Sequence, residues 1–441
     1  MLRSRILSLA WPAIAVNITT PLLSLVDVAV VGHLGNTVYI AAIALGGTMF
    51  NTLYWLFGFL RMGTSGLTAQ AFGEDDQVKC TRTLARSIMI ALVAAALLIA
   101  FADPIGGWLL RLVDDGDAAQ APAMRYFSVA VWGAPAVLVT YSLSGWFLGM
   151  QTSKPMLWMA LIANTLNIGL NFAFVYGLSW DVAGVGAATA ISQWVSAGIG
   201  ILIMRRRLRT MVTAGWRRGL MRLDELRRAF TVNGDIFLRT LCLVAVTLWF
   251  THVGAGQGVL TLSANALLMQ MFMLFSYFMD GFAFAGEALC GRYHGAGDFQ
   301  SLRRTVRALF AIGAFVAVIA TVVYLLAGDA LLAVLTDDRA VLATAHSYLP
   351  WAVAIPLAGF ASFTWDGVYI GLTRTRLMLL SVLVSATMFF VIYFALFPTL
   401  HNHALWLAFI TWLAVRGLMQ TALYAFCVKP QNARIIKNGS M

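Results

Sequence analysis

Residues 6–31 read ILSLAWPAIAVNITTPLLSLVDVAVV, and Asp27 is the single charged side chain in this run. A membrane-spanning helix needs about 20 predominantly apolar residues, so the run is long enough to cross a bilayer. Its apolar part is longer than the core of a secretory signal peptide, and no small-residue cleavage site follows it. We therefore expect it to remain as the first helix of a membrane protein.

Similar apolar runs recur along the whole chain. Of the 441 residues, 60% are hydrophobic and 11% are charged, whereas soluble domains carry roughly 25% charged residues. The fold class that this predicts is an all-α integral membrane protein with twelve transmembrane helices. We expect them near 6–31, 39–70, 87–110, 124–149, 156–178, 184–204, 230–254, 259–289, 306–327, 342–371, 377–398 and 404–427.

Basic residues are distributed unequally between the loops on the two sides. The formal net charge is +11, but Lys and Arg gather in loops on one side, above all in the segment 205–228, whereas the other side has Arg111, Arg125 and Arg339. This asymmetry follows the positive-inside rule, and it predicts that both termini are cytoplasmic. The charge therefore indicates contact with a lipid bilayer rather than with nucleic acid.

The two halves of the chain resemble each other at a constant offset of 222 residues. Gly73 falls on Gly295, Gly145 on Gly367 and Gly149 on Gly371, among other pairs. Two copies of a six-helix unit insert in the same sense, so we expect two bundles related by a pseudo-two-fold axis along the membrane normal. The predicted organisation is an N-terminal lobe 1–204, a basic cytoplasmic linker 205–228, a C-terminal lobe 229–428 and a cytoplasmic tail 429–441.

Asp27 is the strongest candidate for a functional acid, because ionisable groups inside a membrane are costly and are retained for function. Pro12 and Pro21 interrupt the hydrogen bonding of its helix, and Pro21 cannot donate to the carbonyl of Asn17. These three residues predict that the first helix can bend. The alternative is that Asp27 only hydrogen-bonds to neighbouring helices.

The second half carries further charged candidates. Asp235 and Arg239 lie four residues apart, on one helix face, where they line a cavity or form an internal salt bridge. Asp280, Glu287 and Asp366 are further candidates for lining the cavity of the second lobe. Pairing near helix ends explains them equally well.

Asn164, Asn167 and Asn171 share one face of the predicted helix 156–178, because they follow one another at spacings of three and four. We expect these amides to face Asp27, although amides also hold helices together in membranes.

The sequence predicts neither a metal site nor a cofactor, and it contains no nucleotide-binding loop. His252, His294, His401 and His403 are scattered, which argues against a membrane-embedded transferase and against any other enzyme.

Several fragments together resemble the multidrug and toxic compound extrusion (MATE) family, in particular its DinF branch, over nearly the whole chain. They are NITTPLLSLVDVAVVGHLG (17–35), FLRMGTSGLTAQAFG (59–73), NGDIFLRT (233–240), MDGFAFAGE (279–287), WDGVYIG (365–371) and HNHALWLA (401–408). The resemblance implies an antiporter of two six-helix lobes in the bacterial inner membrane, in which an aspartate at the position of Asp27 binds the coupling cation. It also implies amphiphilic, often cationic drugs as substrates, and we expect a monomer.

Helix five of many relatives carries an Asn and, four residues later, an Asp, where this chain has Asn167 and Asn171. The missing carboxylate favours coupling to protons over coupling to Na⁺, which remains the alternative coupling ion. Thr189 is a further member of the cation site by resemblance. Another alternative is a flippase for lipid-linked precursors, since related folds carry such lipids, but the basic residues lie mostly in loops rather than in a central cavity.

Overall fold

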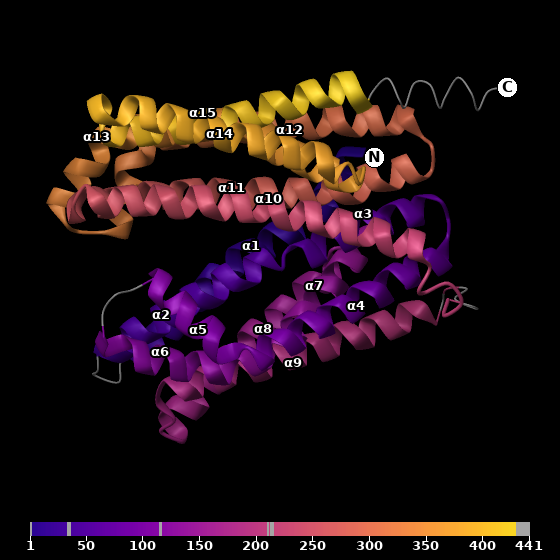
Figure 1. Cartoon of the computed structure of the whole chain (residues 1–441), viewed down its shortest axis with the longest axis horizontal. Helices are drawn as coiled ribbons and strands as arrows, with labels where there is room; N and C mark the ends of the chain where they lie inside the picture. Colours follow the sequence, from indigo (N-terminus) through magenta and orange to yellow (C-terminus); the bar gives the residue numbers. More distant parts are fainter. Residues whose placement is uncertain (1, 33–36, 114–116, 210, 212–215, 429–441) are drawn as a thin grey trace. The chain divides into compact units, whose positions relative to one another are not determined.

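The structure is a computed structural model, and it describes residues 2–32, 37–113, 117–209, 211 and 216–428. Within these residues every regular element is a helix (Figure 1). The prediction of an all-α membrane protein is therefore confirmed. Eleven helical segments of the described part are long and apolar enough to span a membrane, from Val38–Gly73 to Asn402–Phe426. The expected first span, 6–31, corresponds to α1, Leu2–Gly32.

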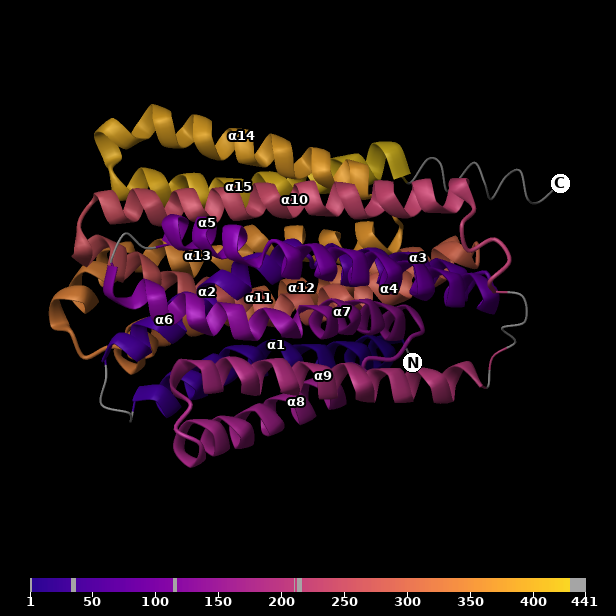
Figure 2. The ribbon, with the colours of Figure 1, turned by 60° about the horizontal axis from the view of Figure 1, so that its bottom comes forward.

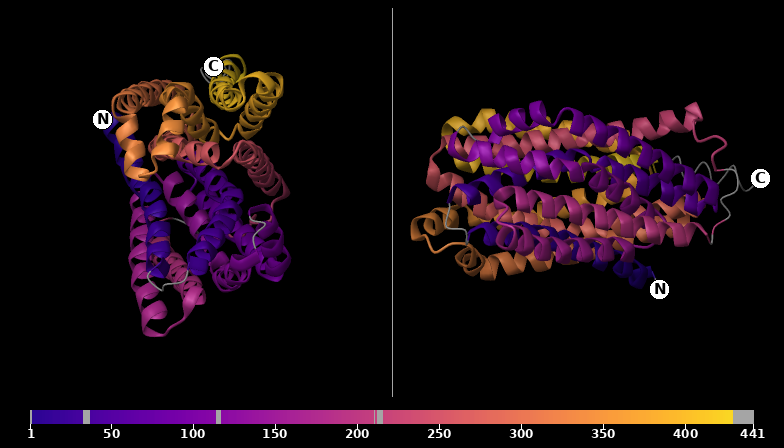
Figure 3. Two further views of the ribbon diagram at one scale, coloured as in Figure 1. Left: turned by 90° about the vertical axis from the view of Figure 1, so that its left-hand side faces the viewer. Right: turned by 90° about the horizontal axis from the view of Figure 1, so that it is seen from below.

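The chain divides into two compact units. The first unit is Trp11–Asn233, and the second comprises Met1–Ala10 together with Gly234–Met441. Within each unit the helices run side by side (Figure 2). The left panel of Figure 3 shows them end-on. The division falls inside α1 and inside α10, rather than in the basic segment 205–228.

The first unit contains most of α1 and the helices up to α9. They are α2 (Thr37–Leu56), α3 (Phe59–Gly73), α4 (Gln77–Ala100), α5 (Ala102–Val113), α6 (Asp117–Ala130), α7 (Ala134–Gly149), α8 (Lys154–Phe172) and α9 (Asp181–Leu208). A 3₁₀ turn, Val131–Gly133, joins α6 to α7, and a π-helical turn, Ala173–Gly177, follows α8. Within this unit α3 packs on α7, α2 on α6 and α8 on α9.

The second unit contains the longer helices. They are α10 (Leu223–Gly256), α11 (Val259–Gly295), α12 (Phe299–Leu335), α13 (Arg339–Gly371), α14 (Thr375–Leu400) and α15 (Asn402–Leu423), followed by a π-helical turn at Tyr424–Val428. Here α11 packs on α13 and α14 packs on α15.

Several predicted helix boundaries were wrong by up to ten residues. The helix expected from 87 begins at Gln77, and the helix expected from 306 begins at Phe299. Hydropathy marks only the apolar part of a helix, whereas its start depends on a cap that satisfies the first N–H groups. In addition, the single span expected at 39–70 consists of α2 and α3, which are separate helices on either side of Gly58.

The 222-residue offset is visible in the atomic contacts. A Cβ atom on Gly145 would lie 2.2 Å from the carbonyl oxygen of Arg61, and one on Gly367 would lie 2.2 Å from that of Ala283. The backbone takes positive φ at Gln151 and again at Thr373. Both copies thus bring α3 against α7, or α11 against α13, at a glycine that leaves no room for a side chain.

Equivalent aspartates cap α4 and α12. Asp76 accepts a hydrogen bond of 2.8 Å from the backbone N–H of Lys79, and Asp298 accepts one of 2.9 Å from that of Ser301. Hydrogen bonds from Ser301 lower the pKa of Asp298 from its ordinary value of 3.8. The contribution of Asp298 to stability is therefore present at neutral pH and is lost as the pH falls below that value.

Asp298→Ala is expected to destabilise the protein by about 1 kcal/mol, because it removes the cap of α12. Thermal melting of the detergent-solubilised protein at pH 7 measures this loss. Asp298→Asn is the control and should melt like the native protein, since an asparagine side chain accepts the same hydrogen bond. Equal melting of the alanine variant and the native protein would show that the cap contributes nothing.

Candidate functional site

Asp27 meets two amides of α8 inside the first unit. Asn171 Nδ2 donates to Asp27 Oδ1 over 2.6 Å, and Asn167 lies one turn before Asn171 on the same helix. Both asparagines are fully buried. The structure thus brings together Asp27, Asn167 and Asn171.

Asn167 connects Asp27 to Thr189 on α9. One amide atom of Asn167 is 3.0 Å from Asp27 Oδ1, and the other is 3.2 Å from Thr189 Oγ1. With its nitrogen toward the carboxylate, the amide donates to Asp27 and accepts from Thr189. When its oxygen faces Asp27 instead, the amide can accept a hydrogen bond from the O–H of a neutral carboxyl group. The Asn167 side chain therefore fits both protonation states of Asp27.

Two further features of this site were not predicted from the sequence. The Tyr126 side chain on α6 hydrogen-bonds to Thr189, and Asn171 Oδ1 is a buried acceptor that has no hydrogen-bond donor among the described residues. Asp27 is not paired with Lys or Arg within the described residues. The site therefore offers one carboxylate and a vacant carbonyl oxygen to a proton or to an ammonium group.

The bend predicted for the first helix remains a prediction. Pro12 and Asn17 are half-buried positions of α1, which continues as one helix through both. Pro21 lies in the same helix, but its side chain is outside the described part.

Asp235 and Arg239 do not form the internal salt bridge that was one of the two alternatives for them. Arg239 on α10 instead forms an ion pair with Asp366 on α13, and Asp235 accepts a 2.8 Å hydrogen bond from the hydroxyl of Thr375. Spacing along one helix shows which residues share a face, but it does not show which neighbouring helix supplies the closer partner.

Arg416 and Gln420 on α15 complete the surroundings of Asp366. Gln420 Nε2 donates to Asp366 Oδ1 over 2.9 Å, and Arg416 lies 3.6 Å from Asp366 Oδ2. Arg416 also donates to Ser362 and lies over the rings of Phe363 and Trp412, at 5.6 and 5.3 Å. Sequence analysis did not identify Arg416 or Gln420. The available signal was an arginine followed four residues later by a glutamine, inside the apolar run 404–427.

The other predicted acids of the second half lie on α11. Asp280 is half-buried and interacts electrostatically with Arg416. Glu287 is buried, with 1% of its surface exposed, and its backbone oxygen would lie 2.7 Å from a Cβ on Gly371. No hydrogen bond between either acid and the Asp366 carboxylate is present among the described contacts. Arg239 and Arg416 thus balance the negative charge of Asp366. Asp27, by contrast, has no basic partner among the described residues.

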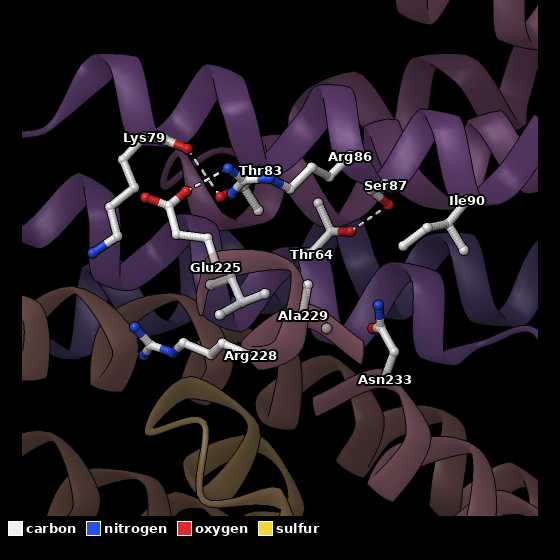
Figure 4. Close-up of a pocket in the computed structure, with 12 residues that line it drawn as sticks. Thr64, Lys79, Thr83, Arg86, Ser87, Ile90, Glu225, Arg228, Ala229 and Asn233 are labelled. Carbon is white, nitrogen blue, oxygen red and sulfur yellow. Dashed lines mark hydrogen bonds and ion pairs between the residues drawn. The ribbon is translucent and has the colours of Figure 1, made fainter. Parts of the chain in front are cut away.

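A small pocket lies between α3, α4 and the first turns of α10 (Figure 4). Glu225 forms an ion pair of 2.5 Å with Arg86, and Thr64 donates to Ser87 over 2.6 Å. The pocket has a volume of about 40 Å³, which is enough for a few water molecules. This pocket is therefore too small for a drug-sized ligand.

Two arginines of α4 hydrogen-bond to the backbone of the basic segment that follows α9. Arg82 donates to the carbonyl oxygens of Trp216 and Arg218, and Arg86 donates to those of Gly219 and Leu220. These two arginines donate to four backbone carbonyl oxygens of a segment whose described residues 216–221 form turns rather than a regular helix.

Comparison with known proteins identifies similarity over nearly the whole chain. The MatE family model matches residues 12–173 and 235–396. The chain is 38% identical to DNA damage-inducible protein F of Escherichia coli (strain K12), over 94% of this chain and 90% of that protein. It is 25% identical to the probable multidrug resistance protein NorM of Acinetobacter baylyi, over 79% of this chain and 78% of the relative.

Among solved structures, the chain is similar to a MATE protein crystallised in the bent conformation. The TM-score is 0.85 at 18% identity, and the match covers 100% of this chain and 97% of that one. This likeness concerns the fold.

Proposed function

This chain belongs to the MATE family of membrane transporters, and on that premise we propose that it exports amphiphilic, often cationic compounds in exchange for protons. The observation that carries the proposal is the state of Asp27, a carboxylate held by the amide of Asn171 without a basic partner among the described residues. A charge in that position attracts either a proton or the cationic group of a drug. The relatives named as multidrug resistance proteins support this substrate class.

In the proposed cycle, a drug and a proton compete for the site around Asp27. Protonation removes the negative charge, and the amide of Asn167 accepts from the neutral carboxyl group, so the attraction for a cationic drug is lost. Exchange of one proton for a monovalent cation moves no net charge, and the pH difference alone drives it. When one proton is exchanged for an uncharged compound, the charge that moves through 100 mV gains roughly 2.3 kcal/mol, which sustains a concentration ratio of about fortyfold at 1.4 kcal/mol per tenfold. Such a ratio is sufficient to lower the drug concentration inside a cell.

Proton coupling is proposed over sodium coupling because the site supplies one carboxylate. Asn171 occupies the place of a possible second acid, and the other groups are amides and the hydroxyl of Thr189. We further propose that the chain is a monomer of the bacterial inner membrane with both termini in the cytoplasm, and that the segment 205–228 links two six-helix lobes.

Drug transport into everted vesicles tests the coupling ion. Ethidium accumulation is expected when the vesicle interior is made acidic in sodium-free buffer, and it should collapse when a protonophore dissipates the gradient. Vesicles without the protein are the control. Accumulation that requires a sodium gradient and survives the protonophore would contradict proton coupling, and the absence of any driven transport would contradict the antiporter itself.

A further inference from the structure

Each residue of the Asp27 site has a counterpart 222 positions later in the second unit. The helices that carry the site, α1 and α8, correspond to α10 and α14. The counterparts of Asp27, Asn167, Asn171 and Thr189 are Trp249, Phe389, Tyr393 and Thr411. Three polar positions of the first copy are therefore aromatic in the second.

The contact between the two helices is retained at these positions. Asp27 and Asn171 meet through a hydrogen bond of 2.6 Å, whereas the rings of Trp249 and Tyr393 meet edge to face with centroids 5.9 Å apart. The same place in the repeated fold thus holds a polar contact in the first unit and an aromatic contact in the second.

Trp249 is at the centre of an aromatic cluster. The ring centroids of Phe390, Phe394 and His252 lie 5.6, 5.9 and 6.0 Å from its own. Trp249 is half-buried, and Phe394 is 61% exposed. The cluster therefore reaches from the interior of the unit to its surface.

The indole N–H of Trp249 is buried and has no hydrogen-bond acceptor among the described residues. Buried indole groups usually find a partner, as Trp406 does with Asn265 and Trp365 does with Thr421. A buried donor without an acceptor costs free energy, which binding of a ligand or water can recover.

We propose that this cluster, centred on Trp249, binds the aromatic cationic part of a substrate. Aromatic faces attract organic cations and stack on planar rings. None of the cluster residues is a carboxylate, so binding here does not depend on the protonation of Asp27. The inference rests on the proposed function for its substrate class, but not for its geometry.

Ethidium binding to the purified protein in nanodiscs tests the site by fluorescence polarisation. Trp249→Leu is expected to weaken binding about tenfold, because it removes the ring and the N–H together. Trp249→Phe should weaken binding less, since it keeps an aromatic face. The loss should be the same in protein that also carries Asp27→Asn, whereas a site built on Asp27 alone would already be lost in that variant.

Two further variants keep the test decisive. Trp158→Leu removes a tryptophan that is 58% exposed on α8 and should bind ethidium like the native protein. Phe394→Leu changes the exposed edge of the cluster without opening the core, and it should weaken binding about threefold even if Trp249→Leu fails to fold.

Native affinity in the Trp249 and Phe394 variants would overturn the proposal, as would failure of the native protein to bind ethidium. These outcomes are separate from those of the transport assay. If the protein binds ethidium through Trp249 but shows no driven transport, the binding site is supported and the antiporter proposal is contradicted. The reverse combination would retain the antiporter and remove the site.

Discussion

Asp27→Asn is expected to reduce pH-driven ethidium export to the level of vesicles without the protein. An amide has nearly the shape of a carboxyl group and can still accept from Asn171, so the helices should remain packed. It cannot gain or lose a proton near neutral pH, and exchange driven by a proton gradient therefore has no carrier group. Initial rates in everted vesicles, normalised to the amount of protein, measure the effect.

Asp329→Asn is the matched control for this variant. Asp329 is an exposed acid on α12 that pairs with His346 over 2.8 Å, and its loss should leave export unchanged. Export by the Asp27 variant at the native rate would remove Asp27 from the mechanism.

Gly145→Ala and Gly367→Ala are each expected to destabilise the protein by about 3 kcal/mol or more, because overpacking that meets backbone atoms cannot be relieved by a rotamer change. In both copies the new Cβ would lie 2.2 Å from a carbonyl oxygen of the facing helix. We expect little monodisperse protein in size-exclusion chromatography after solubilisation, and inactive vesicles.

Gly47→Ala and Gly169→Ala provide the comparison, because no described atom outside the adjoining backbone of the same helix lies within 4 Å of a Cβ built at either position. Both should express and melt like the native protein. If the Gly145 and Gly367 variants behaved in the same way, the close approach of α3 to α7 and of α11 to α13 would be wrong.

The fold could largely be predicted from the sequence, because apolar runs and a constant repeat offset are properties of the chain itself. The approach of Asn171 to Asp27 was also accessible, since three amides on one face of a helix need a polar partner. Trp249, by contrast, looked like ordinary apolar content among 14 tryptophans. Its place became meaningful only when the repeat was combined with ring contacts and an unsatisfied N–H.

The second-unit ion pairs show where prediction from the sequence fails. Arg239 has an acid four residues before it, yet it pairs with Asp366, which lies 127 residues away. A buried arginine takes the partner that the packing of other helices brings closest, and a local spacing rule contains no information about that packing. Arg416 illustrates the same limit, because its partners Ser362 and Asp366 belong to another helix.

The opening helix of each copy is shared between the two units. The first nine residues of α1, Leu2–Ala10, are grouped with the second unit, and the first turns of α10, up to Asn233, are grouped with the first. Pro12 and Gly234 lie next to these divisions, at equivalent positions of the repeat. The boundary between the compact units therefore differs from the boundary between the two copies of the repeat, and a chain cut at either boundary would separate turns of an opening helix from the contacts that group them.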